Sequence, residues 1–287
     1  MTEFDLRCKV FSVTQGYMSG IRQMVRVLVI AVLAFGWAIS ANPAAGTDVT
    51  LRVGIYQNAP KIFRNEAGQP SGFWPGLIEE ISRQKGWTAN YITCEWAACL
   101  KLLEEGDIDV MPDVAYSEAR AAKFVFGKDV VFHSWSLIFH QPGEAISGIL
   151  DLSGLKIAVL AGCIQEERLG QRLKEVGIEG KFVHVQSLRA ALSAASDGTA
   201  DVAVVNRFFG SRLAPKFGLA PSGIVVAPSA VQFAFARGVP SSVVTGFDDV
   251  IAKLKLDGGS VYYKGLAELT ANSSRTSVPA FFYWVIG

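Results

Sequence analysis

Residues 156–206 read KIAVLAGCIQEERLGQRLKEVGIEGKFVHVQSLRAALSAASDGTADVAVVN, and this stretch decides the fold. It contains short apolar segments of the kind that form buried strands, at 156–162, 181–185 and 200–206. The intervening segments 164–177 and 187–198 have the periodicity of amphipathic helices, and Ser187 is placed to cap the second of them. Alternating strands and helices imply a parallel sheet covered by helices.

The same order of strands and helices occurs earlier in the chain. The strands of this first set are LRVGIY at 51–56, WTANYITC at 87–94 and IDVMPDV at 108–114. Between them lie helical segments that end at Gly86 and at Gly106. Two extended segments, VVFHSWSLIFH at 130–140 and SAVQFAFARG at 229–238, connect the two sets. Two crossings predict a hinge, with a cleft between the lobes at the ends of the strands.

The predicted fold class is therefore a two-lobed α/β fold in which each lobe is a mostly parallel sheet flanked by helices. The expected parts are a signal peptide or N-terminal membrane anchor at 1–46, the first part of lobe 1 at 47–140, lobe 2 at 141–228, a segment returning to lobe 1 at 229–272, and at 273–287 a linker with the start of a truncated transmembrane helix.

The two ends of the chain differ from the rest in composition. Residues 25–41 are apolar apart from Arg26, and small residues follow, which is the layout of a secretory signal peptide. An uncleaved anchor remains the alternative, although the run is short for a membrane span. All of residues 278–287 are apolar, which favours the start of a membrane helix over a tail packed on the domain. We therefore expect export to the periplasm and a tether to the inner membrane.

The charge and the cysteines narrow the classes of partner. A formal charge of +1, with no basic cluster in the mature part, argues against binding to nucleic acid. Cys94 and Cys99 are five residues apart, and in an oxidising compartment they form either a disulfide or two buried thiols, of which we expect the disulfide. The cysteines lack the second pair of ligands that a zinc site needs, so no metal or other cofactor is expected.

Five motifs together resemble family 3 of the bacterial extracellular solute-binding proteins, over residues 51–269. They are LRVGIY, GFWPGLIEEISRQKGW, LLEEGDIDVMPDVAYSEAR, DLSGLKIAVLAGCIQ and DGTADVAVVNRFFG, in this order. Within the family the chain is most similar to sensor modules anchored ahead of diguanylate cyclase or histidine kinase domains. The resemblance implies the type II periplasmic-binding-protein fold, and a receptor whose closure is transmitted through a membrane helix to a downstream signalling domain.

The resemblance also suggests site residues. Arg120 in YSEAR matches the arginine that clamps a ligand carboxylate, for which a guanidinium fork is suited. Ser117 is then either a second contact to the anion or the N-cap of the turn that holds Arg120. Asn206 stands where amino-acid-binding members carry an aspartate for the ligand ammonium, so a free α-amino acid is in doubt. Asp113 is either a compensating charge in the cleft or a solvated loop residue.

The other contacts are expected from the second lobe and from aromatic side chains. The sequence AGCIQ joins a strand to a helix, so main-chain N–H groups of Cys163, Ile164 and Gln165 would face an anion from the opposite side. Tyr56 and Trp74 are either an apolar wall over the ligand or part of the core.

We expect a protein that binds a small anionic solute bearing a carboxylate, and not an enzyme. The histidines lie in predicted strands, and the sequence contains no nucleophile-elbow motif or metal-type spacing. One alternative is a free substrate-binding subunit that delivers solute to an ABC permease. The other is a periplasmic dehydratase or lyase that acts on a small carboxylate, with Asp113 or His133 as its acid or base.

Overall fold

The computed structural model describes residues 49–144 and 146–271, which are built around a nine-stranded sheet. The strand order is β4-β1-β5-β11-β7-β10-β8-β9, and β6 pairs with β11 outside this path. The strands are β1 (Thr50–Ile55), β4 (Thr88–Thr93), β5 (Val110–Ala115), β6 (Val125–Phe126), β7 (Phe132–His140), β8 (Lys156–Leu160), β9 (Lys181–Val185), β10 (Val202–Asn206) and β11 (Ala220–Phe235). A separate hairpin pairs β2 (Phe63–Arg64) with β3 (Pro70–Ser71).

Helices cover the sheet, and three of their ends follow the sequence signals. The helices are α2 (Phe73–Lys85), α3 (Trp96–Glu105), α4 (Glu118–Ala121), α5 (Ile164–Glu175), α6 (Leu188–Ser196), α7 (Arg207–Leu213), α8 (Ser241–Leu256) and α9 (Val261–Ala271), with short 3₁₀ turns η1 (Ile149–Leu152) and η2 (Ala214–Phe217). Gly86 and Gly106 end α2 and α3 in the left-handed conformation that glycine adopts readily. The Ser187 hydroxyl accepts a hydrogen bond from the Ala190 N–H at the start of α6, as the sequence predicted.

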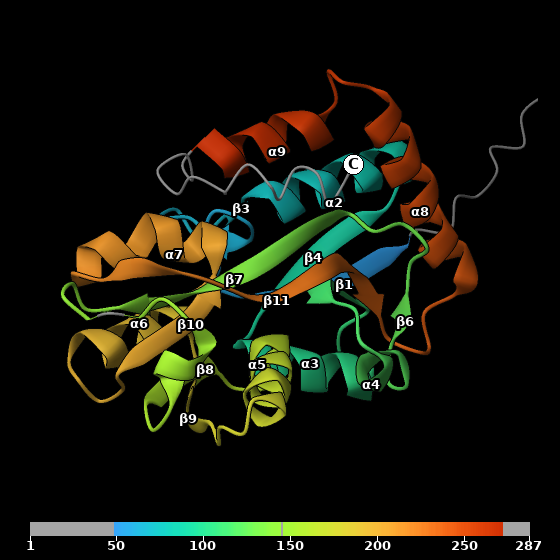
Figure 1. Ribbon diagram of the computed structural model, residues 1–287. Coiled ribbons are helices and arrows are strands. Elements are labelled where there is room, and N and C mark those ends of the chain that lie inside the picture. Colours follow the sequence, from blue (N-terminus) through green and yellow to red (C-terminus); the bar gives the residue numbers. More distant parts are fainter. Residues whose placement is uncertain (1–48, 145, 272–287) are drawn as a thin grey trace, which may run out of the picture. The chain divides into compact units, whose positions relative to one another are not determined.

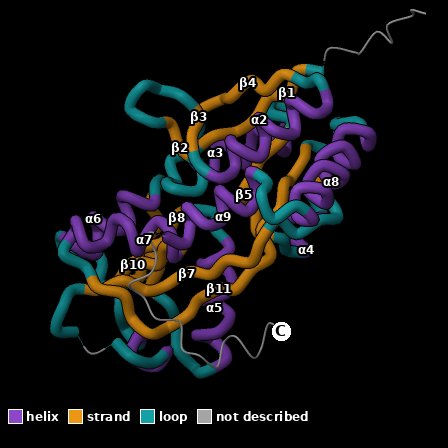
Figure 2. The backbone as a smooth tube through the Cα atoms, turned by 90° about the horizontal axis from the view of Figure 1, so that it is seen from above, coloured by secondary structure: helices purple, strands orange, loops and turns teal. Residues whose placement is uncertain are grey.

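Two parallel sets of strands are joined by two long antiparallel strands. β1 pairs in parallel with β4 and β5, and β8 pairs in parallel with β9 and β10. β11 is antiparallel to β5, β7 is antiparallel to β10, and β7 and β11 pair with each other. Figure 1 shows β7 and β11 running between the two sets, and Figure 2 shows them side by side. The predicted two-lobed α/β fold class is confirmed.

The second crossing strand is longer than the sequence indicated. β11 begins at Ala220, nine residues before the predicted start at Ser229. The sequence did not indicate this part of the strand, because Pro221, Gly223 and Pro228 are residues typical of loops. The register between β11 and β7 shifts twice along the strand, and Ala227 has a positive φ of 49° at the second shift. The expected boundary at 228–229 therefore falls within a continuous strand.

The predicted pair Cys94 and Cys99 forms a disulfide, with 5.4 Å between the Cα atoms. The bond joins the end of β4 to the first turn of α3, and Cys99 is fully buried. Replacing both cysteines by alanine is expected to lower the free energy of unfolding by about 2 kcal/mol. Without the disulfide the unfolded chain is no longer held in a short loop, so it gains conformational entropy. Denaturant unfolding with and without reductant checks this, and reductant should leave the double variant unchanged. Equal midpoints for the variant and the oxidised protein would contradict the expectation.

The signal or anchor at 1–46 and the apolar tail at 273–287 lie outside the described residues. In the part of the chain that the structure describes, no helix combines the length and the apolar character that a bilayer span requires.

Candidate functional site

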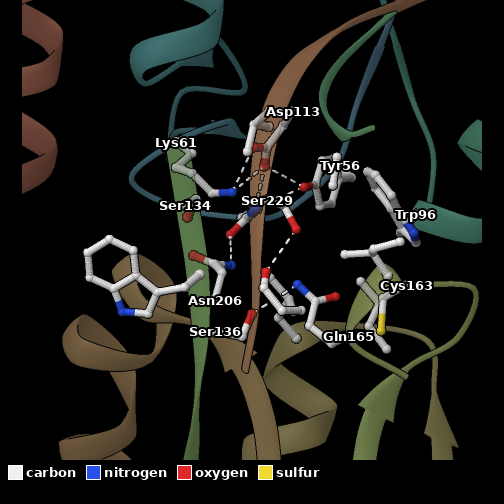
Figure 3. A pocket seen from close by; sticks show the side chains of 18 of the residues that line it. Tyr56, Lys61, Trp96, Asp113, Ser134, Ser136, Cys163, Gln165, Asn206 and Ser229 are labelled. Atoms are coloured by element: carbon white, nitrogen blue, oxygen red, sulfur yellow. Dashed lines mark hydrogen bonds and ion pairs between the residues drawn. The ribbon is translucent and has the colours of Figure 1, made fainter. Parts of the chain in front are cut away.

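A pocket lies where the two parallel sets of strands meet, beside the crossing strands β7 and β11. The pocket is partly open to solvent, and its space with the open part included is about 520 Å³. Its lining comes from the first set, from the second set and from both crossing strands. Figure 3 shows side chains from all these elements directed toward one space.

Arg120 spans the two halves of the fold. Its Nη1 donates to the Ala115 carbonyl at 2.8 Å and its Nη2 donates to the Gly162 carbonyl at 3.1 Å, so one guanidinium contacts both β5 and the turn after β8. The side chain lines the pocket, and burial lowers the pKa of Arg120 from its ordinary value. The Ser117 hydroxyl accepts from the Arg120 N–H at 3.3 Å and caps α4. Ser117 is not among the lining residues, so the structure supports its capping role and not the predicted contact to an anion.

Asp113 lies within the buried strand β5 and is the centre of a buried polar cluster. The Lys61 ammonium lies 2.7 Å from Asp113 Oδ1 and 2.6 Å from Asp113 Oδ2. The Tyr56 hydroxyl and the Asn58 amide donate to Oδ2 at 2.7 and 2.8 Å. Burial lowers the pKa of Lys61, and burial together with the Asp113 charge raises the pKa of Tyr56. Asp113 is thus neither solvated nor an unpaired charge.

Asn206 connects this cluster to the second half of the fold. Its Nδ2 donates to Asn58 Oδ1 at 2.8 Å, and its Oδ1 accepts from the Phe209 N–H at 3.1 Å, which caps α7. Both ends of the Asn206 amide are therefore engaged, one within its own half and one across the pocket. Figure 3 shows Asn206 below Lys61 and Asp113.

The start of α5 lines the pocket but does not offer the predicted row of free N–H groups. The Cys163 N–H donates to the Leu160 carbonyl at 3.2 Å, so it is not available to an anion. Burial raises the pKa of the Cys163 thiol, and the N–H groups of Glu166 and Gln165 oppose this shift. The Gln165 side chain donates to the Ser136 hydroxyl at 2.9 Å and joins α5 to β7. What faces Arg120 from this turn is the Gly162 carbonyl, because the chain turns at Gly162 with a φ of 71°.

The aromatic wall is formed by Tyr56 and Trp96. Their ring centroids are 5.0 Å apart, and Trp96 Nε1 donates to the Gly162 carbonyl at 3.2 Å. Trp74 was the wrong choice, since it is fully buried and packs 4.9 Å from the Phe233 ring in the core. Trp74 also packs 5.6 Å from the Phe132 ring of β7, and it is not among the residues that line the pocket.

Most of the predicted residues gather in one place. Those that line the pocket are Tyr56, Asp113, Arg120, Cys163, Ile164, Gln165 and Asn206. The sequence interpretation missed Lys61, Asn58, Trp96, Ser134 and Ser136. Lys61 and Trp96 could have been suspected, because each follows the carboxyl end of a strand of the first set, where ligands bind to open parallel sheets.

The histidine suggested for an enzymatic alternative lies elsewhere. His133 is an exposed residue of β7 and does not line the pocket, while the other suggested group, Asp113, is paired with Lys61. Within residues 49–144 and 146–271, no cluster of His, Cys, Asp or Glu is arranged to hold a metal ion.

Two α/β halves, joined by two strands around a polar pocket, define the class of two-lobed solute-binding proteins. Residues 51–259 match the family model of bacterial extracellular solute-binding proteins, family 3, and the chain belongs to this family.

Similar proteins include curated binding proteins and a sensor domain. AabA of Dichelobacter nodosus, an amino-acid-binding protein, is 27% identical over 220 residues, which are 71% of this chain and 83% of AabA. PatH of Vibrio harveyi, named as an amino-acid ABC transporter-binding protein, is 26% identical over 52% of this chain. That match spans only 58% of PatH. A histidine kinase sensor domain with similarity to periplasmic binding proteins has the same fold, with a TM-score of 0.68 and 23% identity over 78% of this chain and 96% of its own.

Proposed function

We propose that this protein is a periplasmic receptor that closes around a small solute bearing a carboxylate, either an amino-acid-like compound or an organic acid. It binds the solute without changing it chemically. The named relatives that bind amino acids support a ligand of this size and class.

The observation that carries this proposal is the position of Arg120. Among the described residues its guanidinium forms no ion pair, and its hydrogen bonds go to main-chain carbonyls. A guanidinium has five N–H donors in a planar fork, so donors remain for a carboxylate in the pocket. The buried Arg120 guanidinium, in a pocket between the two halves of the fold, is thus suited to bind an anionic group of a solute.

Closure is expected because the residues that line the pocket come from both halves of the fold. A solute held by Arg120 on the first half and by the Gln165 side chain on the second gains both contacts only when the halves are together. The solute therefore shifts the open–closed equilibrium by its differential affinity for the closed state.

A thermal-shift screen tests the proposal. L-amino acids, 2-hydroxy acids, 2-oxo acids, dicarboxylates and short peptides are added separately, and binding of each hit is measured by calorimetry. We expect at least one carboxylate to raise the melting temperature, by an amount that grows with its concentration. The corresponding amides or esters, which lack the carboxylate charge, should give no shift. A screen in which no carboxylate stabilises the protein would overturn the proposal.

Two roles are compatible with such a receptor. The solved histidine kinase sensor domain supports a sensor role, and the ABC-transporter relative supports delivery of solute to a permease. We favour the sensor role. The reading frame downstream of the codon for Gly287 separates them, since a membrane helix followed by a signalling domain supports the sensor. A stop codon there, with a neighbouring permease gene, would support the importer.

A further inference from the structure

The Lys61 ammonium lines the pocket and forms an ion pair with the carboxylate of Asp113. Both residues are buried, with exposed fractions of 5% each, and the ammonium lies within 2.7 Å of both carboxylate oxygens. The second oxygen also accepts from Tyr56 and Asn58. Asp113 is therefore fully satisfied by the protein itself.

The charges of the pocket leave no anion for a positively charged ligand group. Lys61 and Arg120 are the basic residues of the lining, and Asp113 is its one carboxylate. Arg207 adds a further positive charge nearby, since its charge helps to lower the pKa of Lys61 after the larger effect of burial. The amide of Asn206 is engaged at both ends. A monocarboxylate would balance the lining, whereas a zwitterion would leave its ammonium buried without an anionic partner.

The pocket does hold a neutral polar group that is unsatisfied. The Ser134 hydroxyl lies on β7, lines the pocket and is buried, and it has no hydrogen-bond partner among the described residues. A hydroxyl both donates and accepts, so it suits a ligand hydroxyl or carbonyl oxygen. Figure 3 shows Ser134 next to Lys61, on the side of the pocket that faces Asn206.

We propose that the pocket selects a carboxylic acid that bears a neutral oxygen group, a 2-hydroxy or 2-oxo acid, and rejects the matching α-amino acid. Arg120 binds the carboxylate of the ligand, and Ser134 forms a hydrogen bond with its neutral oxygen. Lys61 already forms with Asp113 the ion pair that the ammonium of an amino acid would need. This inference rests on the proposed function and specifies the class of ligand for the same site.

The test compares pairs of ligands that differ only in the group on the second carbon. Dissociation constants are measured by calorimetry for L-lactate and L-alanine, L-malate and L-aspartate, and the corresponding pairs with larger aliphatic and aromatic side chains. For the side chain that binds best, we expect the hydroxy acid to bind at least about tenfold more tightly than the amino acid.

Two substitutions should reverse this preference. Lys61→Met leaves Asp113 open to a ligand ammonium, and Asn206→Asp adds a carboxylate while keeping an oxygen to cap α7. Each should change the ratio of the two dissociation constants, hydroxy acid against amino acid, by at least about tenfold in favour of the amino acid. The matched control is Lys253→Met, an exposed lysine of α8 outside the pocket, which should keep the original ratio. If Lys61→Met fails to fold, Asn206→Asp decides.

The outcomes separate the two proposals. Amino acids that bind the unmodified protein as tightly as their hydroxy acids would overturn this inference and leave the receptor proposal intact. An unchanged ratio in the folded variants would also overturn it. If neither series binds, this inference fails, and the receptor proposal fails with it when no carboxylate of the wider screen binds either.

Discussion

Replacing Asp113 by asparagine is expected to lower the free energy of unfolding by about 3–5 kcal/mol, because it leaves the buried Lys61 ammonium without its counter-charge. Asparagine has nearly the same size and tolerates the positive φ of 64° at this position, so the backbone is not the cause of the loss. Denaturant unfolding at neutral pH measures the effect.

The matched control is Asp249→Asn, which breaks an exposed pair with Lys85 at 3.4 Å. Exposed ion pairs contribute at most about 1 kcal/mol, so this variant should unfold almost like the original protein. If Asp113→Asn lost no more stability than Asp249→Asn, the buried pair would not be the stabilising centre that its geometry indicates.

The loss in Asp113→Asn should become smaller as the pH rises. Burial already lowers the pKa of Lys61, and the Asp113 charge opposes that shift, so removing the charge lowers the pKa further. Between this lowered pKa and the ordinary lysine value of about 10.4, the unfolded chain binds more protons than the folded chain. The free energy of unfolding therefore increases with pH in that range. A loss at about pH 9 that is no smaller than the loss at about pH 7 would contradict this assignment.

Replacing Arg120 by lysine is expected to weaken carboxylate binding by about 2–5 kcal/mol, or roughly 30-fold to several thousand-fold. Lysine keeps the positive charge but lacks the planar fork that binds both carboxylate oxygens. A lysine ammonium has three N–H donors on one nitrogen, so bonds to the carbonyls of Ala115 and Gly162 would leave it a single donor for the ligand. Calorimetry with the best acid from the screen measures the dissociation constant.

Arg83→Lys is the control for this substitution, since Arg83 is exposed on α2 and pairs with Glu80. It should leave the dissociation constant unchanged. Arg120 also joins the two halves of the fold, so the melting temperature of each variant without ligand is measured as well. A lower melting temperature with unchanged affinity would show that Arg120 only connects the halves and does not bind the solute.

The local structure could be predicted from the sequence because it depends on nearby residues. Apolar periodicity located the strands and helices of both parallel sets, and Gly86, Gly106 and Ser187 end or begin helices as predicted. The pair Cys94 and Cys99 could be predicted for the same reason, since a spacing of five residues brings them together locally. The motif around Arg120 also pointed to a residue that lines the pocket.

The chemistry of the pocket was decided by tertiary structure. Lys61 and Asp113 are 52 positions apart and meet only when the first half folds. Asn58 and Asn206 are 148 positions apart and meet only when the two halves pack together. The same packing buried Trp74 in the core and brought Trp96 to the pocket, although both are tryptophans near the start of a helix. Short-range patterns therefore determined where strands and helices form and which class of fold results. Contacts between distant residues determined which side chains line the pocket. The reason is that hydrophobic burial acts on the whole molecule and leaves few polar groups between the two halves of the fold.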